Sequence, residues 1–226
     1  MSTIDEAIFA LRNGRFVLVH DDKNRENEID MIVAGENITP KHVATMRKDA
    51  GGLLCLAIDG LISKKLGLSY LHDIFNSIPN TNNLFQVMTN GRSPYGDKPS
   101  FSISVNHRQT YTGITDNDRA LTISMVASVC KNIDNGGISE FIHNFRTPGH
   151  VPLLIAAPGL LKQRFGHTEL AIYLAKLAGI TPTVAICEML DSKTFNSLSI
   201  KDAIKYAENA NIPLLESKQI QTYSLI

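Results

Sequence analysis

Residues 16–34 contain two apolar segments separated by a strongly acidic one, and their sequence is FVLVHDDKNRENEIDMIVA. Phe16–Val19 is a short apolar run, which predicts a buried β-strand. Ile29–Ala34 predicts a second strand, so the far end of the acidic segment is fixed to the hydrophobic core. A segment that only formed a free surface loop would not need that attachment.

Helix and strand signals alternate along the rest of the chain. Thr3 and Glu6 have capping-box spacing, and Thr39-Pro40 places an N-cap residue before a proline at the first helical position. Helices are predicted over residues 3–13, 39–50, 118–130, 169–178 and 199–209 and from about residue 217, and further strands over 53–58, 101–105, 151–157, 183–189 and 212–215. This interleaving predicts one domain, residues 1–226, of the α+β (mixed α/β) class, with helices flanking a twisted mixed β-sheet.

Residues 72–99 are the least regular part of the chain. They contain five asparagines, three prolines and two glycines, which are residue types that favour turns and loops. We predict an irregular excursion with short local structure inside the domain, rather than a separate domain.

The composition is ordinary for a soluble globular protein. The 226 residues are 43% hydrophobic and 19% charged, and 22 basic residues balance 22 acidic ones. The sequence contains no basic block of the kind that would indicate a nucleic-acid-binding surface. No apolar run approaches the roughly 20 residues that span a bilayer. The lack of a signal-peptide pattern and the three scattered cysteines predict a cytoplasmic protein with reduced thiols.

The acidic segment Asp21–Asp30 is the first candidate functional feature, because five of its ten residues are acids. If it is extended, Glu26, Glu28 and Asp30 project from one face, where their carboxylates repel one another unless a cation or a bound proton offsets the repulsion. Arg25 lies beside them and suits a phosphate or a carboxylate. A divalent-metal site for a phosphorylated substrate and a solvated charged loop both stay open on these residues alone.

Arg164–Glu169 (RFGHTE) lies where the helix over residues 169–178 begins. The unpaired N–H groups and the positive dipole end of a helix N-terminus suit a phosphate, and His167 could coordinate a metal through a ring nitrogen. The alternative is a capped helix with Thr168 as N-cap and an exposed histidine. The sequence has no HExxH motif and no Cys/His zinc spacing, so a zinc site is not supported.

Other segments also contain the residue types of chemical sites, each with a structural alternative. Residues 146–150 (RTPGH) predict a Pro-Gly turn before a strand, where His150 either acts as an acid or base or caps the turn. Glu188 near the end of an apolar strand requires a salt bridge, a metal or a raised pKa, because a desolvated charge is costly. Residues 110–119 either bind phosphate or connect a strand to a helix capped by Asp118. Cys55 is most simply a small core residue.

Seven stretches of the chain resemble 3,4-dihydroxy-2-butanone 4-phosphate synthase, an enzyme family of riboflavin biosynthesis. In the family's order they are residues 22–30 (DKNRENEID), 46–52 (MRKDAGG), 101–107 (FSISVNH), 112–122 (TGITDNDRALT), 145–150 (FRTPGH), 164–169 (RFGHTE) and 186–188 (ICE). The resemblance spans nearly the whole chain. It implies the fold of that family. It also implies the monofunctional form of the enzyme, without a fused GTP cyclohydrolase II half.

The resemblance implies a lyase that converts D-ribulose 5-phosphate to L-3,4-dihydroxy-2-butanone 4-phosphate and formate. The implied steps are enediol formation, dehydration, a skeletal rearrangement and loss of C4. Proton transfers next to carbonyls need acid–base groups, and the developing enediolate needs a Lewis acid. The implied cofactor is Mg²⁺, with Mn²⁺ as a substitute; Mg²⁺ prefers oxygen ligands and keeps several waters.

The resemblance also implies roles for individual residues. The implied metal ligands are Glu26 and His167. The implied substrate-binding residues are Arg25, Glu26, Asp30, Thr112, Arg164, Phe165 (through its backbone), Gly166, His167, Thr168 and Glu188. The implied catalytic residues are His150, Glu188, Asp30, Glu28 and Cys55.

A homodimer with shared active sites is implied as well, so that His150 or Thr112 acts across the dimer. The implied partner is a small sugar phosphate, with no nucleic acid and no membrane. Relatives carry an arginine where this chain has Ile155, so a buried ion pair is expected to be missing there. Residues 72–99 match the family poorly and receive no function. The acidic segment is expected to be loosely held until metal and substrate arrive.

Two other functions remain as alternatives. Another metal-assisted sugar-phosphate enzyme, such as an aldolase or an isomerase, would use the same residue types. A non-catalytic nucleotide- or RNA-binding module is disfavoured, because carboxylates repel phosphates unless a metal intervenes.

Overall fold

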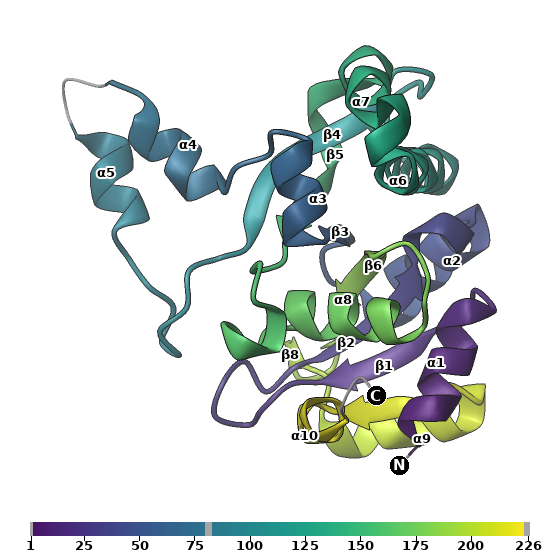
Figure 1. Cartoon of the computed structure of the whole chain (residues 1–226). Helices are drawn as coiled ribbons and strands as arrows, with labels where there is room; N and C mark the ends of the chain where they lie inside the picture. Colours follow the sequence, from purple (N-terminus) through teal and green to yellow (C-terminus); the bar gives the residue numbers. More distant parts are fainter. Residues whose placement is uncertain (1, 80–82, 224–226) are drawn as a thin grey trace.

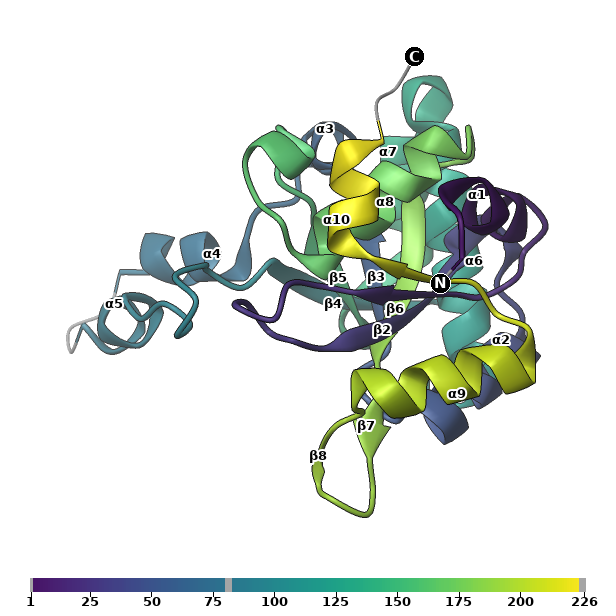
Figure 2. The same cartoon turned by 90° about the horizontal axis from the view of Figure 1, so that it is seen from below.

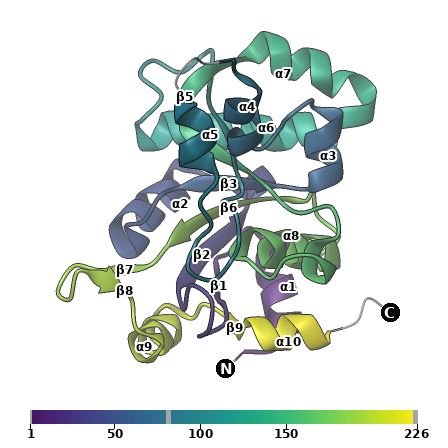
Figure 3. The ribbon, with the colours of Figure 1, turned by 90° about the vertical axis from the view of Figure 1, so that its left-hand side faces the viewer.

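A mixed β-sheet runs through the protein, and helices cover both of its faces (Figure 1). The computed structural model describes residues 2–79 and 83–223, and within them the sheet has seven strands. These strands are β1 Val17–His20, β2 Ile29–Ala34, β3 Cys55–Ile58, β4 Phe101–His107, β5 Phe145–Ile155, β6 Thr183–Glu188 and β9 Leu214–Glu216. A separate hairpin, formed by β7 Leu190–Asp191 and β8 Asn196–Ser197, projects from the body in Figure 3.

All six helices that the sequence predicts are present, and α3, α4, α5 and α7 are additional. The α-helices are α1 Ile4–Arg12, α2 Pro40–Thr45, α3 Gly60–Lys65, α4 Leu71–Ser77, α5 Leu84–Thr89, α6 Asp116–Lys131, α7 Ile138–Asn144, α8 His167–Leu177, α9 Ile200–Ala210 and α10 Ser217–Thr222. Short helical turns are η1 Gly35–Asn37, η2 Met46–Ala50, η3 Ile133–Gly137 and η4 Leu160–Lys162. The predicted capping boxes at Thr3 and Thr39 are both confirmed.

The strand order of the sheet is β4-β5-β3-β6-β2-β1-β9. β1 is parallel to β9 and β3 is parallel to β5, whereas the other neighbouring pairs are antiparallel. The sheet is therefore mixed, and the predicted fold class is confirmed. This order places the start of β2 beside the end of β6, which the sequence alone does not predict.

Side chains of the central strands alternate between two apolar cores. Leu18 packs with α2, α6 and α9, whereas Val17 and Val19 pack with α1, α8 and α10. Figure 2 shows α1, α8 and α10 on one side of the sheet and α2 and α9 on the other. Burial on both faces explains why the central strands are continuous apolar runs in the sequence.

The Pro-Gly turn predicted over residues 146–150 is wrong, because these residues belong to strand β5. Arg146 pairs with Asn106 of β4, and the register between the two strands shifts nearby. A Cβ at Gly149 would overlap the backbone of Val105, so glycine lets the two strands approach closely there. Proline and glycine are found within sheets mainly at such irregular positions.

Residues 71–79 and 83–99 form an arm, of which the first part leaves the main body and the second returns to it (Figure 1). Its helices α4 and α5 pack through Phe75 and Phe85, whose stacked rings have centroids 5.0 Å apart. Residues 80–82, which belong to the predicted excursion, lie outside the described residues. The returning segment contains a tight turn in which the Ser93 N–H donates to the Asp97 carbonyl over 3.0 Å.

Ile155, where the family resemblance implies an arginine, is buried in β5 next to Ile58 of β3. The adjacent Asp59 keeps a charged partner, because its carboxylate lies 2.6 Å from Lys176 Nζ. The three cysteines are buried and free, as predicted for reduced thiols. No helix within residues 2–79 and 83–223 is both long enough and apolar enough to cross a membrane.

Candidate active site

The connection from β1 to β2 is a compact loop that Asp21 organises. One oxygen of Asp21 accepts from the Glu28 N–H over 3.0 Å, and the other accepts from the Glu26 N–H over 3.0 Å and from Arg25 Nη1 over 3.1 Å. Asn27 adopts a left-handed backbone conformation within this loop. The extended geometry considered for the acidic segment is therefore wrong before Ile29, because a carboxylate rather than a neighbouring strand satisfies the loop's N–H groups.

The reason for expecting a loosely held acidic segment, that its charges lack partners without metal and substrate, is wrong, whereas its mobility stays a prediction. Its charges have partners without any ligand. Arg25 pairs with Asp21, and its Nη2 donates to Asp97 over 3.0 Å. Glu28 accepts from Ser197 Oγ over 2.6 Å. These contacts anchor the loop to the arm on one side and to the β7–β8 hairpin on the other.

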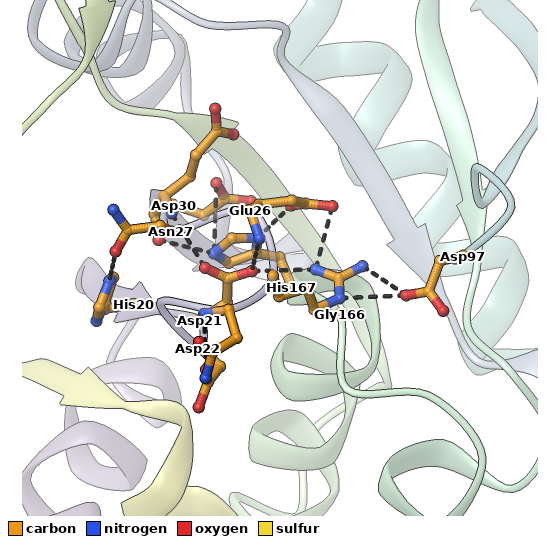
Figure 4. Close-up of polar contacts among 12 residues, drawn as sticks. His20, Asp21, Asp22, Glu26, Asn27, Asp30, Asp97, Gly166 and His167 are labelled. Carbon is orange, nitrogen blue, oxygen red and sulfur yellow. Dashed lines mark hydrogen bonds and ion pairs between the residues drawn. The ribbon is translucent and has the colours of Figure 1, made fainter. Parts of the chain in front are cut away.

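His167, the first residue of α8, contacts the acidic loop with both of its ring nitrogens (Figure 4). Nδ1 lies 3.1 Å from Glu26 Oε2, and Nε2 lies 3.2 Å from the Glu28 carbonyl oxygen and 3.9 Å from Asp30 Oδ1. The ring is only 6% exposed, so the alternative of a solvent-exposed histidine is wrong. Residues that lie 141 positions apart in the sequence thus form one cluster.

Asp21, Glu26 and His167 each offer a ligand atom, and these atoms lie within 4.8 Å of one another. The motifs in the sequence do not single out Asp21. A possible signal is its place at the start of a tight loop, where aspartate commonly accepts hydrogen bonds from the following N–H groups. The cluster contains oxygen and imidazole donors, which suit a divalent cation.

The ionisable groups of the cluster have different pKa values, because burial and neighbouring charges act differently on each. Burial, opposed by His167 and reinforced by the charge of Glu188, raises the pKa of Asp30 to about 7. Burial alone would raise the pKa of Glu26, but contact with His167 and Arg25 outweighs it and lowers the pKa to about 2. Burial alone would lower the pKa of His167, but Asp30 and Glu26 raise it to about 9.

At neutral pH, therefore, Glu26 is ionised, whereas Asp30 can either donate or accept a proton. Asp30 Oδ1 is buried and, within the described part of the chain, has no hydrogen-bond partner. A buried polar atom without a partner is costly in a folded protein and calls for an explanation. An acceptor that points into the cluster with a near-neutral pKa is suited to acid–base chemistry.

Glu188 ends β6 directly opposite Asp30 of β2. Its Oε2 accepts from the Leu53 N–H over 2.7 Å. A Cβ at Gly52 would overlap the Glu188 side chain, so glycine makes room for the carboxylate beside the backbone. Cys55 lies buried in the neighbouring strand, where burial together with Glu188 and Asp30 raises the pKa of its thiol far above neutrality. The Cys55 side chain is therefore a neutral thiol.

Gly166 is the N-cap of α8, so the alternative assignment of Thr168 as N-cap is wrong. Thr168 is buried, whereas Phe165 is 46% exposed. A Cβ at Gly166 would overlap the guanidinium of Arg164 and come close to that of Arg25. Two guanidinium groups therefore converge over the N-terminus of α8, where the helix dipole also favours an anion.

Glu169 holds Arg164 and the first turn of α8 in place. It is fully buried and accepts from the Ala157 N–H over 2.9 Å and the Gly166 N–H over 3.2 Å, and it pairs with Arg164. We expect Glu169→Ala to lower the free energy of unfolding by about 3–5 kcal/mol, because it leaves a part-buried guanidinium and two N–H groups without their acceptor. Urea denaturation measures this loss, and the exposed Glu208→Ala is the control. A loss as small as that of the control would contradict the supporting role.

His150 and Thr112 belong to a second group of polar residues. Asn106 accepts from the His150 N–H over 2.8 Å, and its Nδ2 lies 3.0 Å from His150 Nδ1 and 3.5 Å from the Thr112 carbonyl oxygen. Asp118 accepts from Thr112 Oγ1 over 3.3 Å. The N-cap of α6 is Thr115, so the alternative of Asp118 as helix cap is wrong.

Within residues 2–79 and 83–223, no hydrogen bond or ion pair joins the His150 group to Glu26, His167 or Glu188. The side chains of His150 and Thr112 are instead exposed at the surface of the protein. The structure therefore brings most of the predicted residues together in one cluster, but it leaves His150 and Thr112 in another.

Comparison with known proteins places this chain in a family. A family model described as 3,4-dihydroxy-2-butanone 4-phosphate synthase matches residues 5–223. A protein of that name from Methanothermobacter thermautotrophicus is 46% identical over 217 residues, covering 96% of this chain and 93% of the relative. One from Candida albicans is 32% identical over 221 residues, covering 97% of this chain and 95% of the relative.

A solved structure is similar as well. A crystal structure of 3,4-dihydroxy-2-butanone 4-phosphate synthase in complex with two magnesium ions has a TM-score of 0.77 and 28% identity, and the match covers 97% of this chain and 95% of that one. The agreement extends over the sequence, the fold and almost the full length of both chains. The chain belongs to the 3,4-dihydroxy-2-butanone 4-phosphate synthase family.

Proposed function

We propose that the cluster around Glu26 and His167 is where this lyase converts D-ribulose 5-phosphate to L-3,4-dihydroxy-2-butanone 4-phosphate and formate in riboflavin biosynthesis. Membership of the family supports the reaction. The observation that carries the assignment to this site is the 3.1 Å contact between Glu26 and His167, beside a buried Asp30 whose pKa lies near neutrality. This arrangement combines a cation site with a proton-transfer group, and the reaction needs both.

The residues of the cluster fit a magnesium ion. Glu26 and His167 would hold it, with Asp21 close by, and the carboxylate oxygens are the hard ligands that Mg²⁺ prefers. When bound, the ion would act as a Lewis acid toward the oxygens of the substrate. Mn²⁺ is a reasonable substitute, because it accepts the same carboxylate ligands.

The residues beside the proposed magnesium site have separate roles in proton transfer and in supporting the site. Asp30, with a pKa of about 7, takes a proton from carbon next to the substrate carbonyl and returns it later. Glu188, held by the Leu53 N–H, lies opposite Asp30 and serves as a second acid–base group. Glu28 is held by Ser197 and orients the loop. Cys55 remains a neutral thiol that lines the site.

The N-terminus of α8 binds the phosphate of the substrate. Arg25 and Arg164 supply guanidinium groups that suit phosphate oxygens. Gly166 and the backbone of Phe165 let the phosphate approach the chain closely, and Thr168 adds a donor. The sugar would then extend from α8 toward Glu26 and Asp30, which lie next to His167 in the same cluster.

The enzyme is proposed to be a homodimer in which each active site uses both subunits. Support comes from the exposed His150 and Thr112, which, in the part of the chain that the structure describes, make no hydrogen bond or ion pair with the Glu26 cluster of their own subunit. His150 of one subunit would complete the cluster of its partner as an acid–base group. A twofold interface presents the same surface from both subunits, so two equivalent sites would form.

The reaction is tested by incubating the purified protein with ribulose 5-phosphate and Mg²⁺ and measuring formate. We expect formate and the four-carbon phosphate in equal amounts. Removal of the metal with EDTA should abolish turnover, because the enediolate loses its Lewis acid, and added Mg²⁺ or Mn²⁺ should restore it. A folded, metal-loaded preparation that produces only an isomerised sugar phosphate would support the isomerase alternative instead.

A further inference from the structure

Asp97, at the base of the arm, contacts both arginines of the phosphate-binding end with one carboxylate oxygen. Oδ2 accepts from Arg25 Nε over 3.2 Å and from Arg25 Nη2 over 3.0 Å, and it lies 3.4 Å from Arg164 Nε. A carboxylate thus already lies at the convergence of two guanidinium groups. Carboxylate and phosphate oxygens bind the same donor fork of arginine.

Arg25 has no edge left for a phosphate while Asp97 is in place. Its Nη1 faces Asp21 and Glu26, at 3.1 Å each, and its Nε–Nη2 edge faces Asp97. The ring of Tyr95 covers the guanidinium, with its centroid 4.8 Å from Cζ. The side chain of Arg25 is only 9% exposed. A phosphate can therefore reach the Nε–Nη2 edge of Arg25 only if Asp97 leaves it.

The turn over residues 93–97 positions this carboxylate and leaves it accessible. The Ser93 N–H and Oγ both donate to the Asp97 carbonyl, over 3.0 and 2.9 Å, and the Gly96 N–H donates to the Ser93 carbonyl over 2.8 Å. Asp97 itself remains 32% exposed. Partly exposed ion pairs contribute little net stability, so a phosphate dianion with three acceptor oxygens can replace this single carboxylate oxygen.

We propose that Asp97 is an internal surrogate for the substrate phosphate, which occupies the Nε–Nη2 edge of Arg25 in the free enzyme and leaves it when the phosphate binds. The proposal rests on the proposed function, because it requires Arg25 and Arg164 to bind that phosphate. Asp97 is then a specificity-determining residue. A sugar without a phosphate cannot replace it, and two arginines stay paired when no substrate is present.

The first test is the affinity of the full-length, magnesium-free protein for inorganic phosphate, measured by titration calorimetry. A competing internal group weakens apparent affinity in proportion to its occupancy, so Asp97→Ala and Asp97→Asn should each bind phosphate about three- to tenfold more tightly. Asp73→Asn is the matched control, because it removes one negative charge from an exposed position of the same arm. The control should stay within about twofold of wild type.

The second test separates a surrogate from a structural group by kinetics with ribulose 5-phosphate and Mg²⁺. Removing a competitor of the free enzyme improves binding of substrate and transition state equally, so KM should fall while kcat is unchanged. If Asp97 instead aligns the two arginines during catalysis, Asp97→Ala will raise KM or lower kcat. Either of these results would overturn the proposal.

Arg25→Gln distinguishes failure of this proposal from failure of the phosphate assignment. It should weaken phosphate binding at least about tenfold, because it removes a charge-assisted donor pair. If Arg25→Gln loses affinity but neither Asp97 variant gains any, the surrogate role is wrong and the phosphate site stands. If Arg25→Gln binds phosphate as wild type does, the phosphate assignment of Arg25 fails, and the surrogate role fails with it.

Discussion

Glu26→Gln and His167→Ala should each lower the rate of formate release by about a thousandfold or more, a loss of about 4 kcal/mol of transition-state stabilisation. Each substitution removes a proposed magnesium ligand from the contact that joins the acidic loop to α8. The fold should persist. In Glu26→Gln, Arg25 keeps Asp21 and Asp97 as partners, and Asp21 still holds the loop through the Glu28 N–H.

The measurement combines turnover at saturating substrate and Mg²⁺ with calorimetric titration of Mg²⁺ and a thermal melt of each variant. Weak Mg²⁺ binding with a near-normal melt would show that the ligand, rather than the fold, has been lost. Glu208→Gln, on the exposed face of α9, is the matched charge control and should be as active as wild type. Turnover within tenfold of wild type in either site variant would contradict the assignment of these two residues as ligands.

A mixture of two inactive variants should recover activity if the active sites are shared between subunits. His150→Ala and Glu26→Gln place their lesions in different clusters. A mixed dimer therefore contains one site with both lesions and one site with none. Random subunit exchange gives half mixed dimers, so the mixture should reach about a quarter of wild-type activity.

The control for this experiment is a mixture of Glu26→Gln with His167→Ala. These residues lie in the same cluster of one subunit, so every site of a mixed dimer carries at least one lesion and no activity should return. Native mass spectrometry establishes that mixed dimers have formed in both samples. If mixed dimers of His150→Ala and Glu26→Gln stay inactive, or if the active enzyme is monomeric, the shared site is wrong.

Local features of the fold were predictable because they depend on neighbouring residues. The apolar runs of β1 and β2 indicate buried strands, and Thr3 and Thr39 cap their helices through side-chain bonds to the following turn. The predicted turn over residues 146–150 is instead an irregular part of strand β5. Asn106 of β4 pairs with Arg146 and Val105 pairs with Val151, so residues 147–150 form an irregularity between two paired positions. Proline and glycine within sheets favour such positions.

The candidate site was predictable in its residue types but not in its contacts. The acidic segment and the RFGHTE motif were both visible, and the family resemblance joined them. The shape of the acidic loop could not be predicted from the sequence, because it depends on three hydrogen bonds to Asp21. The role of Asp97 could not be predicted either, because it lies in the segment with the weakest motifs. Its contact with Arg25 joins residues 72 positions apart in the sequence.

The sequence by itself determined the fold class, the family and the acids and arginines available for catalysis, because periodicity, caps and motifs are local patterns. Only the tertiary structure decided that Glu188 lies opposite Asp30, that Asp97 pairs with the arginines, and that His150 lies in a separate cluster from His167. Sheet order and register set the contact between Glu188 and Asp30, and they are fixed by burial on both faces of the sheet, to which residues from the whole chain contribute. The contact of Asp97 with the arginines depends instead on how the arm returns to the acidic loop.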